Sequence, residues 1–165
     1  MATGSLVSVH EYLSTSYRPD CDYVDGVVLE RNLGEYDHSR LQMAVSGYYY
    51  LRRKEWGVNP LPEQRVQVSP TRFRIPDICV TTDSNPPQIF ATPPFICVEI
   101  LSKDDSLSEC RRRAGDYLEF GVPYVWILDP ASRKAWRCTP EGMDEVTELR
   151  TENPETLVPV CDLFE

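Results

Sequence analysis

Apolar residues repeat at the spacing of one helical face in two stretches of the chain, residues 37–56 and 106–120. The first stretch ends at Gly57, and glycine commonly terminates a helix. The second begins with Ser106 and Glu109, the two residues of a capping box. The pattern therefore predicts two amphipathic helices.

The β-prone runs in the first half of the chain come in pairs with turn residues between them. In "DYVDGVVLE", Asp25-Gly26 separates two such runs and predicts a tight hairpin. In "QRVQVSPTRFRIPDICVTT", Ser69-Pro70-Thr71 marks a turn between two runs of alternating polar and apolar residues. A second hairpin is predicted there, and its return strand is expected to carry Pro76-Asp77.

The second half of the chain predicts a parallel strand pair. "FICVEIL" and "YVWILDP" are apolar runs on either side of the predicted helix 106–120, so the three segments form a β-α-β unit. "KAWRC" follows as the next partner strand. Together with the antiparallel hairpins, this order predicts a mixed β-sheet flanked by helices, in an α+β or α/β domain.

Length and composition narrow the class of protein. A chain of 165 residues with 41% hydrophobic content suits one domain, 1–165. We expect its core at about residues 9–138, with the acidic, proline-containing segment 139–165 at the periphery. No apolar run approaches a membrane span, and the first residues lack the basic and apolar regions of a signal peptide. The expected location is therefore cytoplasmic.

Net charge argues against a general nucleic-acid coat protein, and cysteine usage argues against a protein stabilised by disulfides or zinc. A formal net charge of −9 argues against a general nucleic-acid coat protein, although it leaves room for a local basic face. The six cysteines include no C-x-x-C pair, so we interpret them as small buried side chains. Disulfides and a structural zinc site are not expected.

Two acidic residues stand in strand-like surroundings where a lone carboxylate would be costly. Glu99 interrupts the apolar run "PPFICVEILS", and Asp77 belongs to the strand-like segment before it. If these two strands are neighbours, their carboxylates come together and need a counter-ion. Oxygen ligands suit a hard divalent cation such as Mg²⁺ or Mn²⁺, so Asp77 and Glu99 are candidate metal ligands.

A basic residue lies within reach of this pair. On the helical wheel of residues 106–120, Arg113 falls at the border of the apolar stripe, close to Cys110 and Tyr117. It can therefore extend toward Glu99, either as a structural ion pair or as a catalytic cation.

The motifs "YVDGVVLE", "DHSRLQ", "RFRIPDICV", "PPFICVEILS" and "DYLEFGVPYVWILDP" together resemble the Uma-type restriction endonuclease family, a branch of the PD-(D/E)xK nucleases. The resemblance implies a restriction-endonuclease-like fold and hydrolysis of DNA phosphodiester bonds with a divalent metal. It also implies that Asp77 is the Asp of the PD element and Glu99 the acidic residue of the (D/E)xK element. Leu101 stands where the motif has its lysine. In this branch the basic residue lies in the following helix, at the position of Arg113, where many relatives carry lysine.

The same resemblance adds two residues and a partner. His38 falls where the family usually has a histidine and is a candidate for orienting water or phosphate, with a structural hydrogen bond as the alternative. Glu30, at the end of the first hairpin, is a candidate further metal ligand or a solvated carboxylate, and Asp22 has a weaker claim. Paired subunits are common in the family, and the aromatic surplus of "GYYYL" also favours a homodimer.

Three functions are compatible with the sequence. The leading one is a metal-dependent endonuclease, in which the metal lowers the pKa of the attacking water and Arg113 stabilises charge on the phosphate. Arginine stays protonated and cannot replace lysine as a general base, which favours the alternative of an inactive nuclease fold used for binding or assembly. Glycoside hydrolysis by the carboxylate pair is a weaker reading, because a neighbouring arginine should lower a carboxylate pKa.

Overall fold

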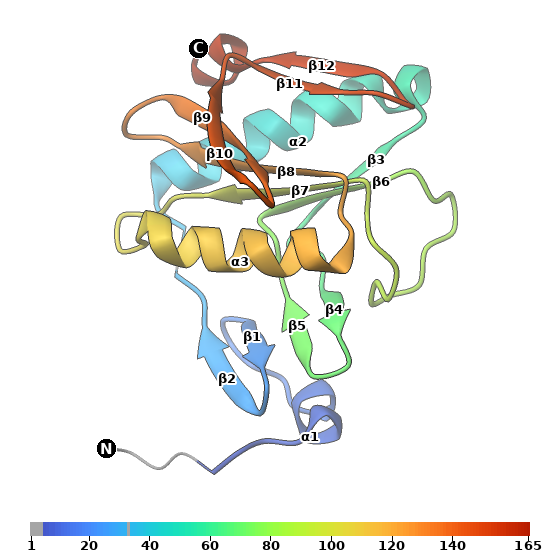
Figure 1. Cartoon of the computed structure of the whole chain (residues 1–165), viewed down its shortest axis with the longest axis vertical. Helices are drawn as coiled ribbons and strands as arrows, with labels where there is room; N and C mark the ends of the chain where they lie inside the picture. The colour runs from blue at the N-terminus through green and yellow to red at the C-terminus, as the bar shows by residue number, and fades with distance from the viewer. Residues whose placement is uncertain (1–4, 33) are drawn as a thin grey trace.

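The computed structural model describes residues 5–32 and 34–165, and its centre is a six-stranded sheet (Figure 1). The strand order is β10-β9-β8-β7-β6-β3. Only β7 and β8 are parallel among these pairs, and α3 connects them as the predicted β-α-β unit. The strands are β3 (Asn59–Pro62), β6 (Ile78–Thr81), β7 (Ile96–Ile100), β8 (Tyr124–Asp129), β9 (Lys134–Thr139) and β10 (Gly142–Val146).

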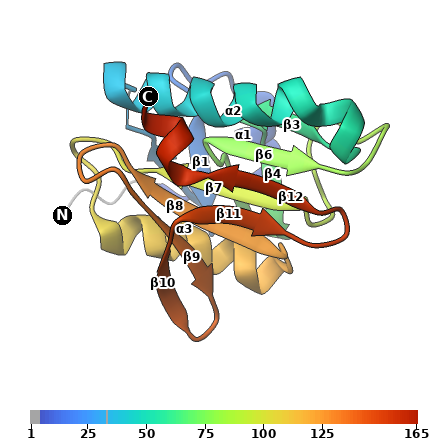
Figure 2. The same ribbon diagram turned by 90° about the horizontal axis from the view of Figure 1, so that it is seen from above.

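Two helices, α2 (Tyr36–Trp56) and α3 (Leu107–Phe120), cover opposite faces of this sheet (Figure 2). Side chains alternate along each strand, so Ile78 and Val98 pack under α2 whereas Cys79 and Cys97 pack under α3. The predicted capping box is present at the start of α3. Both helices end at a glycine in the left-handed region, where a side chain would be strained.

The first hairpin and the second form a separate four-stranded sheet, in the order β2-β1-β5-β4, below α3 in Figure 1. Tyr12 of α1 (Val9–Ser14) packs there with Tyr23 and Phe73 in a small aromatic core. The turn residues Asp25 and Gly26 both have positive φ, as a tight hairpin turn requires. The strands are β1 (Cys21–Val24), β2 (Val27–Glu30), β4 (Val66–Ser69) and β5 (Arg72–Arg74).

The return strand of the second hairpin differs from the expectation. It ends at Arg74, and the chain then passes through Pro76 and Asp77 into β6 of the other sheet. Proline has no N–H for a strand ladder, which explains a break at this point. The expectation that the return strand carries Pro76-Asp77 is therefore wrong, and Asp77 lies on the connection between two sheets.

The C-terminal segment 139–165 is also placed differently, because it is part of the core. After β10, it forms the hairpin β11 (Glu148–Thr151) and β12 (Thr156–Pro159) and the 3-10 helix η1 (Val160–Phe164). Leu149, Val158 and Leu163 are buried in the same apolar cluster as the inner face of α2. Its strands carry few apolar residues each, so the sequence pattern there was too weak to show this burial.

Five of the six cysteines are buried, as their apolar surroundings predicted, and Cys161 is exposed. In residues 5–32 and 34–165, no helix combines the length and apolar character that a membrane crossing requires.

Candidate active site

Asp77 and Glu99 lie next to each other at the ends of β6 and β7. These strands are antiparallel with Ile78 opposite Val98, so the next position places Asp77 opposite Glu99. Both residues follow the alternation of Cys79 and Cys97, which puts them on the face covered by α3. Both are buried, and both line one cavity of about 460 Å³ bounded by β2, the start of α2 and the first half of α3.

Both side-chain oxygens and the backbone carbonyl of Asp77 have polar partners. Its Oδ2 accepts a hydrogen bond from the Ile100 N–H at 2.8 Å, and its carbonyl accepts one from Gln42 Nε2 at 2.9 Å. Its Oδ1 lies 3.3 Å from Arg31 Nη2 and 3.3 Å from His38 Nε2. The strand β7, helix α2 and the end of the first hairpin thus converge on this one carboxylate.

Glu99 is held from α3. Arg113 Nε donates to Glu99 Oε2 at 3.0 Å, and the Tyr117 hydroxyl donates to Oε1 at 2.5 Å. The other end of the Arg113 guanidinium donates to Asp105 Oδ2 at 2.5 Å. The contact that the helical wheel indicated is therefore present, and it includes a second carboxylate that the sequence did not suggest.

Burial dominates the ionisation of Glu99. Removal from water raises the pKa of Glu99 to about 7, because the favourable charge of Arg113 only partly opposes the burial and Asp77 adds repulsion. The expectation that a neighbouring arginine lowers the carboxylate pKa is therefore wrong in net direction. A bound divalent cation would remove this penalty by stabilising the charged form.

The remaining sequence candidates occupy different depths of the cavity. His38 is at the start of α2, and although burial lowers its pKa, the contact with Asp77 outweighs this and holds the pKa above the usual value. Asp22 is buried beside Arg74, whose Nη1 lies 3.1 Å from its Oδ2. Glu30 lines the rim, where its side chain is exposed.

The lining of the cavity is acidic overall. Of the described residues that line it, seven are acidic and four are arginines. The acidic ones are Asp22, Glu30, Asp77, Glu99, Asp104, Asp105 and Glu109, and the arginines are Arg31, Arg74, Arg112 and Arg113. An excess of hard carboxylate oxygens fits a divalent cation such as Mg²⁺ or Mn²⁺.

Unsatisfied polar atoms at the same cavity also fit a bound polar group. Among the described residues, buried His38 Nδ1, Ser102 Oγ and Asp105 Oδ1 have no hydrogen-bond partner, and all three residues line this cavity. No set of three or more His, Cys, Asp or Glu side chains in the described chain is grouped to hold a metal ion. Asp77 and Glu99 would therefore be two ligands, with water and phosphate oxygens supplying the rest, as is common for Mg²⁺.

Sequence reasoning missed three residues of this site. Arg31, which directly follows the first hairpin, and Asp105 were not singled out, and Tyr117 was assigned to the apolar stripe of its helix. Their charge and hydroxyl groups were visible in the sequence. Their convergence was not, because it depends on how the two sheets and α3 are placed.

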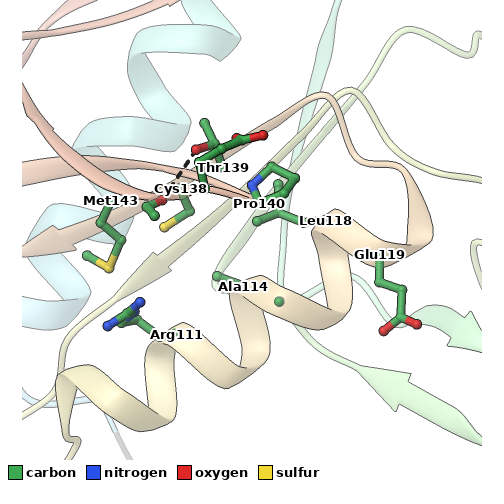
Figure 3. A pocket seen from close by; sticks show the side chains of 11 residues that line it. Arg111, Ala114, Leu118, Glu119, Cys138, Thr139, Pro140 and Met143 are labelled. Carbon is green, nitrogen blue, oxygen red and sulfur yellow. Dashed lines mark hydrogen bonds between the residues drawn. The ribbon is translucent and has the colours of Figure 1, made fainter.

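A second cavity, of about 380 Å³, lies between α3 and the hairpin of β9 and β10 (Figure 3). Arg111 and Ala114 line it from the helix, and Cys138 and Met143 line it from the hairpin. Its acidic residues, Glu119 and Glu141, are both exposed, and its described lining includes no buried carboxylate pair. The first cavity is therefore the candidate site.

Comparison with known proteins agrees with this geometry. The model of the Uma2 family, described as "Putative restriction endonuclease", matches residues 9–165. The chain belongs to the Uma2 family. The resemblance seen in the sequence motifs is confirmed, and the match includes the C-terminal segment that forms part of the core. Family membership gives the protein a nuclease-like function, and restriction-endonuclease-like proteins generally use a divalent metal.

A solved structure shares the fold of this chain. The crystal structure titled "a putative nuclease belonging to DUF820 from Anabaena variabilis ATCC 29413" has a TM-score of 0.82 to this Uma2 chain at 20% sequence identity. The alignment covers 96% of this chain and 97% of that one, so the whole α+β fold is shared, as the element order predicted. A search of curated proteins gave no match.

Proposed function

We propose that this protein is an endonuclease that hydrolyses DNA phosphodiester bonds with Mg²⁺ or Mn²⁺. The observation that supports this proposal most is the buried pair of Asp77, which directly precedes β6, and Glu99 on the adjacent β7, at one cavity in a chain of the Uma2 family. Buried carboxylates this close together need a cation, and a nuclease fold supplies a use for it.

The residues of the site would have separate roles in phosphodiester hydrolysis. Asp77 and Glu99 would hold the metal ion, which would supply positive charge for the phosphate and a lower pKa for the attacking water. Arg113 would donate to phosphate oxygens, and it cannot accept a proton because its pKa is raised further by Glu99 and Asp105 despite burial. His38 would keep Asp77 oriented and reach water or phosphate with its free Nδ1. Glu30 at the rim would add to the negative potential that attracts the cation.

Cleavage of plasmid DNA tests the proposal directly. We expect nicking by the wild type with Mg²⁺ or Mn²⁺ but not with EDTA, and its loss in Asp77→Asn, which keeps the side-chain shape and removes one ligand charge. Asp144→Asn, an exposed carboxylate on β10 outside the cavity, is the matched control and should cleave normally. Equal cleavage in EDTA, or by Asp77→Asn, would contradict the proposal.

An inactive binding module is the second candidate, and one observation favours it. Both proposed ligands already have an arginine partner, Arg31 for Asp77 and Arg113 for Glu99. A site in which these ion pairs persist would bind DNA without cutting it. A gel-shift assay beside the cleavage assay separates the two, because this candidate requires a shifted complex with intact DNA in every metal.

We also propose that the protein forms a homodimer through the outer face of α2. Tyr36, Met43, Tyr50 and Leu51 are all more than half exposed on this helix. Residues spaced by seven share a helical face, and Gly47 lies between Met43 and Leu51 with open space above it. A helix with apolar side chains on its outer face as well as its inner face usually has a partner.

Charge on α2 favours a second copy as that partner. The first turn carries Asp37 and the last turn carries Arg53 and Lys54, so two antiparallel copies would place opposite charges together. Light scattering should give twice 18.9 kDa at tens of micromolar for the wild type and the monomer mass for Leu51→Asp. Leu107→Asp changes an exposed leucine on α3 and should remain dimeric. A monomeric wild type would refute this interface.

A further inference from the structure

Arg31 is a buried cation that the proposed reaction does not use. It directly follows β2 and enters the cavity, where its side chain is 19% exposed. Three carboxylates surround its guanidinium: Asp77 Oδ1 at 3.3 Å, Glu63 Oε1 at 3.6 Å and Asp22 Oδ1 at 4.0 Å. A guanidinium among three carboxylates supplies positive charge where a divalent cation would also be attracted.

The contact with Asp77 is the one that matters for a metal. Asp77 Oδ2 is already bonded to the Ile100 N–H, which is fixed in the ladder of β7. Oδ1 is therefore the oxygen that faces the positive groups of the site, and Arg31 Nη2 and His38 Nε2 each lie 3.3 Å from it. A divalent ion and a guanidinium repel each other, so both cannot occupy the near side of Oδ1.

Arg31 has an exposed carboxylate partner, whereas both carboxylate partners of Arg113 are buried. Glu63 is an exposed partner of Arg31, with its side chain 61% exposed, and it can keep Arg31 after Asp77 is released. Arg113 is held on both sides by buried Glu99 and Asp105. Of the two arginines at the carboxylate pair, Arg31 is thus the one that can turn outward at small cost.

We propose that Arg31 is an internal counter-ion of Asp77 that occupies the metal side of this carboxylate and must turn toward Glu63 when a divalent cation binds. Arg31 then sets how much free cation the site needs before it fills. The inference rests on the proposed function, since it takes Asp77 as a metal ligand. Arg31 is a positioning residue in this account, because it acts on the metal through Asp77.

Binding of Mn²⁺ to the full-length protein without DNA tests the inference, with no reliance on activity. Wild type and Arg31→Met are titrated by calorimetry, because methionine keeps much of the length of the side chain and removes the charge. We expect Arg31→Met to bind Mn²⁺ at least about tenfold more tightly, since one positive charge a few ångströms from the ion is gone. Arg150→Met removes the same charge from an exposed ion pair on β11 and should leave the affinity within about twofold.

Each outcome of these Mn²⁺ titrations bears on the counter-ion role of Arg31, on the nuclease proposal, or on both. Binding by Arg31→Met with none by wild type also supports the counter-ion. Equal or weaker binding by Arg31→Met refutes it and leaves the nuclease proposal standing. If neither protein binds Mn²⁺ at millimolar concentration, both proposals fail.

A measurement on the wild type covers the case in which Arg31→Met does not fold. The side-chain Nε–H signal of Arg31 is followed by NMR during a titration with diamagnetic Mg²⁺. We expect this signal to shift as the site fills while that of Arg150 stays in place. An Arg31 signal that does not move at saturating Mg²⁺ overturns the inference.

Discussion

In the absence of metal, substitution of Glu99 by glutamine should raise the stability of the protein relative to wild type progressively as the pH rises above about 4.5. Glutamine has nearly the same shape and cannot ionise, and it keeps one acceptor oxygen in place of the two that receive Arg113 and Tyr117. The folded wild type holds a proton on Glu99 up to a pKa of about 7, whereas the unfolded chain releases it near 4.5. The folded state therefore binds more protons between these values, and the free energy of unfolding of the wild type falls as pH rises through this window.

The size of the effect follows from the same two values. A difference of this size between the folded and unfolded pKa corresponds to about 3 kcal/mol at pH 8, and it disappears below pH 4.5. Against it, the variant loses one charge-assisted hydrogen bond from Arg113, which costs about 1–3 kcal/mol at every pH. The absolute stability of Glu99→Gln can thus lie on either side of the wild type. The stability difference between Glu99→Gln and wild type can change with pH in only one direction, because only the wild type titrates at this position.

Urea unfolding in EDTA from pH 4.5 to 8, followed by tryptophan fluorescence, measures this difference. Trp126 is buried in the core and reports on global unfolding. The stability of Glu99→Gln relative to wild type should rise by about 3 kcal/mol across the range and then level off. Glu145→Gln, an exposed carboxylate on β10, should give a flat difference. A flat or falling difference for Glu99→Gln would show that Arg113 outweighs burial and that the reasoning is wrong.

Three further changes have expected outcomes. Arg113→Lys should retain DNA nicking whereas Arg113→Ala should lose most of it and, by leaving two buried carboxylates unpaired, destabilise the protein by about 3–5 kcal/mol in urea unfolding. Tyr117→Phe should cost about 1–3 kcal/mol at pH 8 and clearly less at pH 5, because the lost hydroxyl donor serves the charged form of Glu99. Leu149→Ala should cost about 2–5 kcal/mol by the same assay, as expected for a core residue and not for a peripheral tail.

Much of the fold could be predicted from local patterns. Both long helices end at a glycine stop signal, α3 also begins with a capping box, and Asp25-Gly26 favours a tight turn. The β-α-β unit follows from chain order and the handedness of such units. These features depend on residues close together in the sequence. The division into separate sheets at Pro76 and the burial of Leu149 depend on long-range packing, which no local period reports.

Only part of the candidate site could be predicted from the sequence, for a related reason. Asp77, Glu99 and Arg113 stood out because each places a charge in or beside an apolar pattern, where a charge needs an explanation. Arg31 lies just after a short exposed strand, where arginine is ordinary, and so its sequence context raised no question. Its role depends on the approach of the four-stranded sheet to the end of β6, which only the structure shows.

The charges at the junction of the two sheets, buried or partly buried, form a continuous alternating series. Arg72 and Arg74 both bond Asp116 of α3, Arg74 also bonds Asp22, and Arg31 joins Asp22 to Asp77. Removal of Arg74 takes a partner from two buried carboxylates at once, Asp116 and Asp22, which is more costly than replacing a whole pair by apolar side chains. In the history of such a chain, these positions are therefore expected to change in pairs. Coupled substitution at them across homologous sequences would be the evolutionary record of this contact network.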